Sequence, residues 1–406
     1  MIIRSNKLYE YSFLMVLFCF SISLFNLAGY IFSAIVLGMF FFYGHRLYLT
    51  TSDLWILLFS FCYFLIYGLQ YGVDVETFIL YLLGPWTAHI MGHQYMEQST
   101  NKNSFVVFLV VISSGMFIHG ILNIFAYLRS DYFSLHQYYR QAVDFWRGDL
   151  VNVKTTEMLF TFATGLGVGM LFTSYKRKYK VLALIVLAAV MVSTVFMANR
   201  AMLIIFASLL LWRVVCWYSD SKISVNQKCV FAILSLIIIF IAIILVLFNV
   251  KGVADYILEL KIIQRFTSKN ELTRFDVWKL FFEGLRFLEF PFGGKQLTLN
   301  SEFGYIHNMW LDIYNVAGFI PFIVSIVLTF KIIISFDRFN KTMKEANKEN
   351  ERVLFQSLVI AIFMNMLIEP IIEANPYFLL MAFMFFGAME TCTHKTLSEL
   401  NTGPIN

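Results

Sequence analysis

Two basic side chains at the ends of apolar segments are best suited to chemistry. Arg200 closes the segment Met197-Ala198-Asn199-Arg200 between two apolar blocks. A guanidinium at a tight turn presents a fixed fork of donors that fits phosphate oxygens, although it can also anchor a helix end. His307 precedes another apolar block. Histidine is the side chain best suited to remove a hydroxyl proton at neutral pH, and a solvated interfacial histidine is the alternative.

Polar residues continue from His307 into the next apolar block. Asn308, Asp312 and Asn315 recur at helical spacing, which places them on one face near the outer end of that helix. Such groups inside a span usually face a bundle interior or a wet cavity, where they bind a substrate or hold helices together. Glu369 lies in a short turn beside Pro370. It is either an acidic partner for the arginines or a solvated turn residue.

A long loop over residues 250–307 contains further candidates. We expect an amphipathic helix from Asp255 to Phe266 that carries Arg265, and a second helix that ends at Phe290 before Pro291. Arg274 and Trp278 lie one turn apart on the second helix. These arginines either bind an anionic ligand or snorkel at the membrane interface.

A shorter loop over residues 128–154 interleaves bases such as Arg140 with aromatic side chains. This pattern suits sugar and acid recognition, and it also suits a membrane interface without any ligand. Elsewhere, His89 and His93 form an i, i+4 pair with no acidic partner between them as in H-E-x-x-H, so a structural role is favoured. All five cysteines fall in or near apolar blocks. We therefore predict no metal site and no disulfide.

The elements that must position these residues are membrane-spanning helices. The chain is 59% hydrophobic and only 14% charged, which excludes a water-soluble protein. We predict an all-α polytopic membrane protein, one membrane domain over residues 1–406 with about 12 transmembrane helices and a large helical loop between the ninth and tenth spans. The predicted spans lie at 11–27, 29–43, 54–72, 77–96, 105–127, 155–174, 181–197, 201–217, 229–249, 308–335, 353–369 and 376–391.

Basic residues set the predicted orientation. Lys176, Arg177, Lys178 and Lys180 share one short loop, and a second basic run covers residues 331–352. Because cytoplasmic loops hold the excess of Lys and Arg, both loops and both termini are predicted to be cytoplasmic. The loops 128–154 and 250–307 then face outward. No Walker motif, Rossmann glycine pattern or internal repeat occurs, so neither an ATP-driven pump nor a visibly duplicated transporter is indicated.

The order of these motifs resembles the O-antigen polymerase and O-antigen ligase superfamily of bacterial surface-polysaccharide assembly. The resemblance is strongest over residues 155–330. It rests on Ala198-Asn199-Arg200, on Arg274 to Trp278, on the turn Pro291 to Gly294, and on His307-Asn308 followed by Leu311 and Gly318. It implies an inverting, metal-independent glycosyltransferase that needs no cofactor. The enzyme would sit in the bacterial inner membrane and act at the periplasmic face on oligosaccharides linked to undecaprenyl diphosphate.

The resemblance also implies roles for the candidate residues. Arg200 and Arg274 would hold the diphosphate and stabilise its growing charge, as preorganised arginines can do without a metal. His307 would orient or deprotonate the acceptor hydroxyl. The residues that we assign to substrate binding are Arg265, Asn308, Asp312, Arg140, Trp278 and Glu369.

The sequence favours a polymerase over a ligase. The outer loop is short for a protein that must also grip a lipid A core, and the richness in Phe, Ile, Tyr and Asn resembles that of the variable polymerases. A flippase for the same lipid-linked unit is the alternative from another class, and a scaffold without substrate is a third. The expected partners are the lipid-linked oligosaccharide, membrane lipids, a chain-length regulator and a flippase, with no nucleic acid.

Overall fold

The structure, a computed structural model, describes residues 2–26, 38, 49–99, 101, 103–134, 141–219, 274–285, 289, 292–293 and 305–402. Seven described helices are long and apolar enough to cross a membrane. They are α3 (Thr51–Tyr71), α6 (Ser104–Arg129), α9 (Arg177–Phe196), α10 (Arg200–Ser219), α16 (Phe319–Glu345), α17 (Glu349–Ile368) and α19 (Pro376–Thr402). The helical membrane character is thus confirmed. The total of about 12 spans stays a prediction. The spans expected at 29–43 and 229–249 lie outside the described residues. The segments expected to span at 11–27, 77–96 and 155–174 are described, but their helices are not among the seven.

Shorter elements complete the described fold. The helices are α1 (Ile2–Ser21), α4 (Val75–Thr77), α5 (Gly84–Gln98), α7 (Asp131–Ser134), α8 (Val153–Leu171), α14 (Arg274–Glu283), α15 (Met309–Ala317) and α18 (Ile371–Ala374), with the short helical segments η1 (Leu24–Asn26) and η2 (Phe78–Leu83). The loop predicted at 128–154 contains an antiparallel hairpin of β1 (Gln141–Val143) and β2 (Leu150–Asn152), in which Ala142 faces Val151. The sequence analysis did not predict this hairpin.

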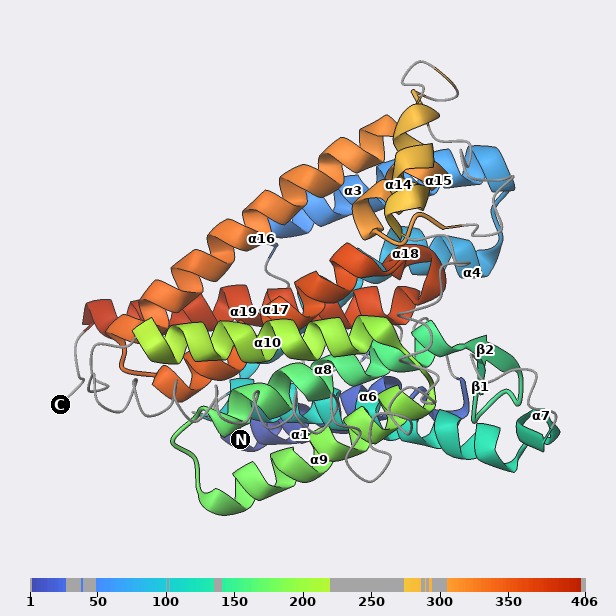
Figure 1. The fold of residues 1–406 in the computed structure, drawn as a ribbon. Coiled ribbons are helices and arrows are strands. Elements are labelled where there is room, and N and C mark those ends of the chain that lie inside the picture. Colours follow the sequence, from blue (N-terminus) through green and yellow to red (C-terminus); the bar gives the residue numbers. More distant parts are fainter. Residues whose placement is uncertain are drawn as a thin grey trace.

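The bundle has two distinct ends (Figure 1). One end carries the α8–α9 connection with its lysines, the α16–α17 connection and the C-terminal end of α19, and we call it the basic end. The opposite end carries β1, β2, α7 and α18, and we call it the loop end. Helices α8 and α10 begin at the loop end and α17 finishes there, so their terminal residues meet in space.

Close backbone contacts hold the bundle together where glycines face each other. A Cβ added to Gly92 of α5 would lie 1.8 Å from the carbonyl oxygen of Met384 in α19. A Cβ added to Gly387 would lie 2.1 Å from the carbonyl oxygen of His89. Small residues let membrane helices approach this closely, and the contact is then stabilised by dispersion and polar interactions rather than by expulsion of water.

Two predicted helices near the candidate site have different bounds in the structure. The helix expected over 308–335 is broken at Gly318, which has φ 83° and separates α15 from α16. Only α16 qualifies as a membrane span. The second loop helix was expected to reach Phe290, but α14 ends at Glu283, where Gly284 follows. The helix expected from Asp255 to Phe266 lies outside the described residues.

Candidate active site

His307 lies in a buried cluster with a lysine and a glutamate at the loop end. Lys154 Nζ, from the first turn of α8, is 3.1 Å from Nδ1 and 3.2 Å from Nε2 of the imidazole. Glu369 Oε2, just after α17, is 3.7 Å from His307 Nδ1. His307 is only 6% exposed and Glu369 only 3%. A lysine and a glutamate therefore flank the imidazole ring at a place where little water screens their charges.

The backbone around His307 is held in a strained conformation by Asp312. His307 has φ 59°, in the left-handed region that non-glycine residues rarely adopt. The Asp312 carboxylate accepts hydrogen bonds from the backbone N–H of Ile306 at 2.7 Å and of Asn308 at 3.2 Å. These are the two residues that flank His307. Such strain persists only where surrounding contacts fix it, and it is common at functional sites.

Asn308 fixes the same segment to two helices. Its side-chain oxygen accepts the backbone N–H of Leu311 at 3.1 Å and so caps α15. Its amide donates to the carbonyl of Leu367 in α17 at 3.0 Å. The sequence predicts that Asn308 and Asp312 bind substrate. In the structure their hydrogen bonds position the His307 segment, and a contact with substrate stays a prediction.

Helix α14 braces the His307 segment from the other side. Trp278 Nε1 donates to the carbonyl of Ile306 at 2.9 Å, and the buried side chains of Val277 and Phe281 pack with Ile306 and Tyr314. The arginine-tryptophan motif of the large loop thus lies directly against the residue before His307. Its tryptophan acts as a positioning residue in the structure.

The Arg200 turn borders the His307 cluster. Ala198 has φ 51°, and Asn199 caps α10 by accepting the backbone N–H groups of Ala201 at 2.7 Å and Met202 at 3.3 Å. Asn199 and Ala201 line one small cavity together with Lys154 and Glu369. Arg200 is therefore the half-buried first residue of a helix that begins beside the cluster. Residues from four segments of the chain, around positions 154, 200, 307 and 369, therefore meet at the loop end.

The remaining predicted arginines cannot be placed in full. Arg274 is the first residue of α14, while its side chain lies outside the described part of the chain. Arg265 and Arg140 also lie outside it. Their roles stay predictions.

Two charged residues of the cluster, the half-buried Lys154 and the buried Glu157, were missed from the sequence. Lys154 precedes an apolar block, where a lysine normally snorkels to the interface, but here it contacts His307. Glu157, one turn further along α8, is 3% exposed and lines the same small cavity. A carboxylate inside a predicted span was the available signal. Glu373, which follows Glu369 by four residues, accepts a hydrogen bond from Tyr63 of α3.

The Asp312 carboxyl titrates in the physiological range. Burial raises its pKa to about 7, while the backbone N–H groups of Ile306 and Asn308 act in the opposite direction and favour the charged form. Above that pH the carboxylate holds the His307 segment most strongly, because charged acceptors form the stronger hydrogen bonds.

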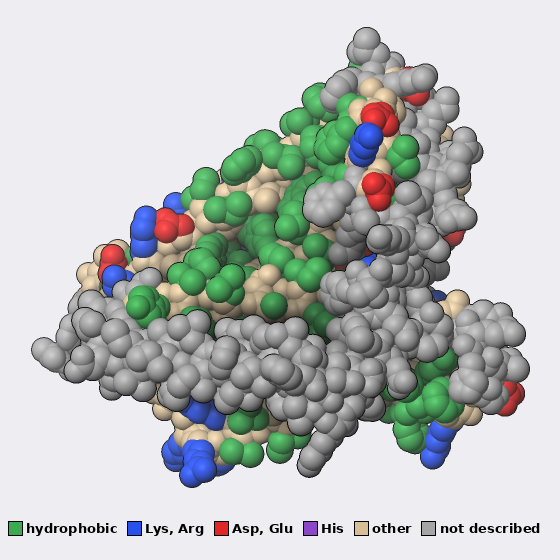
Figure 2. Space-filling view, viewed as in Figure 1, with side chains coloured by type: hydrophobic (Ala, Val, Ile, Leu, Met, Phe, Trp, Pro, Cys, Tyr) green, Lys and Arg blue, Asp and Glu red, His purple; other side chains and the backbone are tan. Residues whose placement is uncertain are grey.

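A small apolar cavity of about 20 Å³, roughly the space of one water molecule, lies among the helices next to this cluster. It is lined by Met309 and Ile313 of α15, by Leu328 and Ile332 of α16, and by Phe363 and Met366 of α17. Met309 follows His307 by two residues, so the cavity borders the polar cluster. Figure 2 shows apolar side chains along α16 and a hollow beneath the helix.

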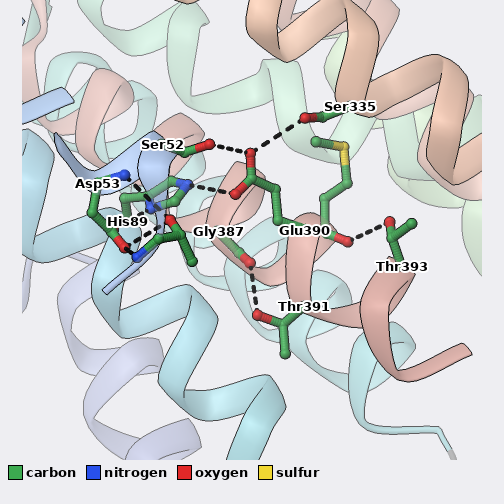
Figure 3. Close-up of polar contacts among 10 residues, drawn as sticks. Ser52, Asp53, His89, Ser335, Gly387, Glu390, Thr391 and Thr393 are labelled. Atoms are coloured by element: carbon green, nitrogen blue, oxygen red, sulfur yellow. Dashed lines mark hydrogen bonds and ion pairs between the residues drawn. The ribbon is translucent and has the colours of Figure 1, made fainter. Parts of the chain in front are cut away.

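A second buried polar cluster explains His89 (Figure 3). His89 Nδ1 lies 2.7 Å from Asp53 Oδ1 of α3, and its Nε2 lies 3.9 Å from Glu390 Oε2 of α19. Glu390 also accepts hydrogen bonds from Ser52 at 2.6 Å and Ser335 at 3.3 Å. The acidic partners that the sequence spacing lacked therefore come from other helices. Among the described residues no group of three or more potential ligands is arranged to hold a metal ion, and the contacts tie four helices together.

Comparison with known proteins adds no relative. No protein-family model matches the sequence, and no curated protein matches it either.

Proposed function

We propose that the chain is a membrane glycosyltransferase that polymerises oligosaccharide repeat units carried on a polyprenyl diphosphate. The observation that carries this proposal is the buried cluster of Lys154, His307 and Glu369 beside the Arg200 turn. It combines a base, an orienting carboxylate and cations, which are the groups that metal-free transfer from a diphosphate requires. The basic loops at the opposite end support an orientation with this cluster at the periplasmic face of the inner membrane and both termini in the cytoplasm.

Each group has a role in the proposed reaction. Arg200 and Lys154 bind the diphosphate oxygens of the donor and stabilise the negative charge that grows on them. His307 accepts the proton of the acceptor hydroxyl, and Glu369 stabilises the imidazolium that results. The acceptor oxygen forms a bond to the anomeric carbon as the bond from that carbon to the diphosphate oxygen breaks. The electron pair leaves with the lipid diphosphate, so a single displacement inverts the anomeric centre.

The apolar hollow beneath α16 supports a lipid-linked donor (Figure 2). Exposed apolar side chains follow α16, among them Ile323, Phe330 and Ile334. A polyprenyl chain lying against this helix within the membrane would bring its diphosphate to the loop end, where Lys154 and the Arg200 turn lie. Binding energy from such a remote part of a substrate positions the reacting centre.

Turnover by purified protein tests the proposal. The substrate is the lipid-linked oligosaccharide that accumulates in source cells lacking this chain, supplied in detergent to the purified wild-type protein. We expect a ladder of longer lipid-linked glycans. Because loss of a general base typically slows a reaction by about 10²–10⁴-fold, His307→Ala should abolish the ladder at wild-type incubation times.

Further variants identify the cluster and separate the alternatives. Lys154→Met should also lose the ladder, whereas Lys279→Met should keep it, since Lys279 is an exposed partner of Glu283 on α14. Glycan transfer that occurs only when lipid A core is added would show that the protein is a ligase and not a polymerase. Folded protein that is inactive with both acceptors would contradict the proposal and favour a transporter of the same lipid.

A further inference from the structure

A second cavity of about 390 Å³ opens at the loop end, beside the His307 cluster. It lies between α6, the β1–β2 hairpin and the α18–α19 turn, and its polar lining includes His119, Asn123, Asp144, Arg147, Asn375 and Tyr377. Thr155 lines this cavity, while its neighbour Lys154 contacts His307. The volume falls within the range of about 300–1,000 Å³ that is usual for small-molecule sites.

The hairpin wall of this cavity is docked firmly on the bundle. Trp146 Nε1 donates to the carbonyl of Ile22 after α1 at 2.9 Å. The backbone N–H of Phe145 donates to the side-chain oxygen of Asn123 in α6 at 3.0 Å. The hairpin therefore holds the Asp144 side chain and the backbone of Arg147 in place, which lowers the entropy cost of binding a ligand beside them.

The cavity presents polar atoms that other side chains do not satisfy. Asp144 Oδ1 accepts the backbone N–H groups of Trp146 at 2.9 Å and Arg147 at 2.8 Å. Its Oδ2 lies 3.8 Å from His119 Nε2, which is too long for a hydrogen bond. His119 is 8% exposed, and its Nε2 has no hydrogen-bond partner among the residues that the structure describes. A ligand hydroxyl that forms a hydrogen bond with this buried nitrogen would satisfy it, and this favours binding of the ligand.

The carboxylate of Asp144 is charged under physiological conditions. Burial acts to raise its pKa, but His119 and the two backbone N–H groups lower the pKa overall to below the ordinary value. The lining thus combines two carboxylates, Asp144 and Asp149, with amides, an imidazole and one guanidinium, so donors and acceptors are mixed and the carboxylates disfavour an anionic ligand. Such a lining suits a neutral ligand with many hydroxyl groups, whereas the His307 cluster has the cations that a diphosphate needs.

We infer that this cavity binds a sugar of the acceptor oligosaccharide and so holds its hydroxyl beside the His307 cluster. This inference rests on the proposed function and assigns the acceptor and the donor diphosphate to neighbouring sites. The two sites are separated by the first turn of α8.

Binding of free glycan tests the inference. The probe is the oligosaccharide released by mild acid from the lipid-linked unit that accumulates in cells lacking this chain. Its affinity for purified full-length protein is measured by calorimetry. Because hydrogen bonds to a charged group are the stronger ones, we expect Asp144→Asn to weaken binding by about tenfold or more. His119→Gln removes the buried Nε2 and should weaken binding as well. Lys279→Met, which changes an exposed side chain on α14, should leave binding unchanged.

The outcomes separate this inference from the proposed function. Wild-type protein that does not bind the glycan, or cavity variants that bind it as well as wild type, would overturn the acceptor site. In the turnover assay, excess acceptor should restore the ladder of Asp144→Asn but not that of His307→Ala. Glycan binding that is lost in the cavity variants, with no turnover by wild type, would keep the cavity as a glycan site and remove the polymerase proposal.

Discussion

Asp312→Asn should loosen the backbone on both sides of His307 without unfolding the protein. The Asp312 carboxylate accepts the N–H groups of Ile306 at 2.7 Å and Asn308 at 3.2 Å, and the side chain is 2% exposed. Asparagine retains one oxygen, so one of the two N–H groups loses its acceptor and faces an amide N–H₂ group instead. A hydrogen bond to a charged group contributes about 1.5–3 kcal/mol, so we expect local opening to become easier by about 2 kcal/mol.

Hydrogen exchange measures this change directly. A difference of about 2 kcal/mol corresponds to about 30-fold faster exchange of the two amides, since each 1.4 kcal/mol is a factor of ten. The experiment is run in detergent at pH 8, above the Asp312 pKa of about 7, so that the wild-type side chain is charged.

A matched control separates this effect from the loss of any carboxylate. Asp337 pairs with Lys341 on α16, and both side chains are more than half exposed. Exposed pairs at this spacing contribute only about 0.3–0.5 kcal/mol, so Asp337→Asn should leave exchange at residues 305–309 unchanged. Equal exchange of that segment in wild type and Asp312→Asn would refute the idea that Asp312 holds His307 in place.

Three further predictions follow from the packing and the hairpin. Gly293→Ala should lower the melting temperature in detergent, because Gly293 has φ 91° and a Cβ there would lie 2.2 Å from Tyr314 Oη. We expect the free energy of unfolding to fall by more than about 1 kcal/mol, and an unchanged melting temperature would contradict this. Gly92→Ala should reduce the yield of monodisperse protein in size-exclusion chromatography, because its Cβ would lie 1.8 Å from the Met384 carbonyl oxygen; wild-type yield and stability would show that α5 and α19 are not in such close contact. The pKa of Asp144 is lower in the folded state, so its contribution to hairpin docking is present above its unfolded pKa of about 3.9 and is lost as the pH falls through the folded pKa. Pepsin cleavage of the wild-type hairpin, divided by cleavage of Asp144→Asn at the same pH, should therefore rise only in that acid range. A ratio that stays constant with pH would refute this prediction.

The sequence identified the segments of the candidate site better than the roles of their residues. Helical spacing placed Asn308 and Asp312 on the face that meets His307, and the tight turn at Arg200 lies beside the same cluster. Spacing alone could not reveal that the Asp312 carboxylate accepts hydrogen bonds from the backbone N–H groups on either side of His307. That contact depends on a left-handed residue, which the pattern of apolar and polar residues does not encode.

Contacts between distant segments account for most of what was missed. Lys154 reaches His307 across 153 positions of the sequence, and Asp53 and Glu390 approach His89 from separate helices. In each case the partner lies on a different segment of the chain. A single sequence does not show which residues of two packed helices lie next to each other, so these contacts could not be predicted. The β1–β2 hairpin was missed for a local reason, since its strands are three residues each and are too short for a recognisable alternation.

The most direct test of the proposed activity compares wild type with His307→Gln in the turnover assay, at saturating lipid-linked oligosaccharide. Glutamine retains a polar group of similar reach but cannot act as a base at neutral pH. We expect ladder growth to be at least about a hundredfold slower in the variant, with an unchanged melting temperature. Ladder growth within a few-fold of wild type would contradict the assignment of His307 as the base and, with it, the catalytic role of the cluster.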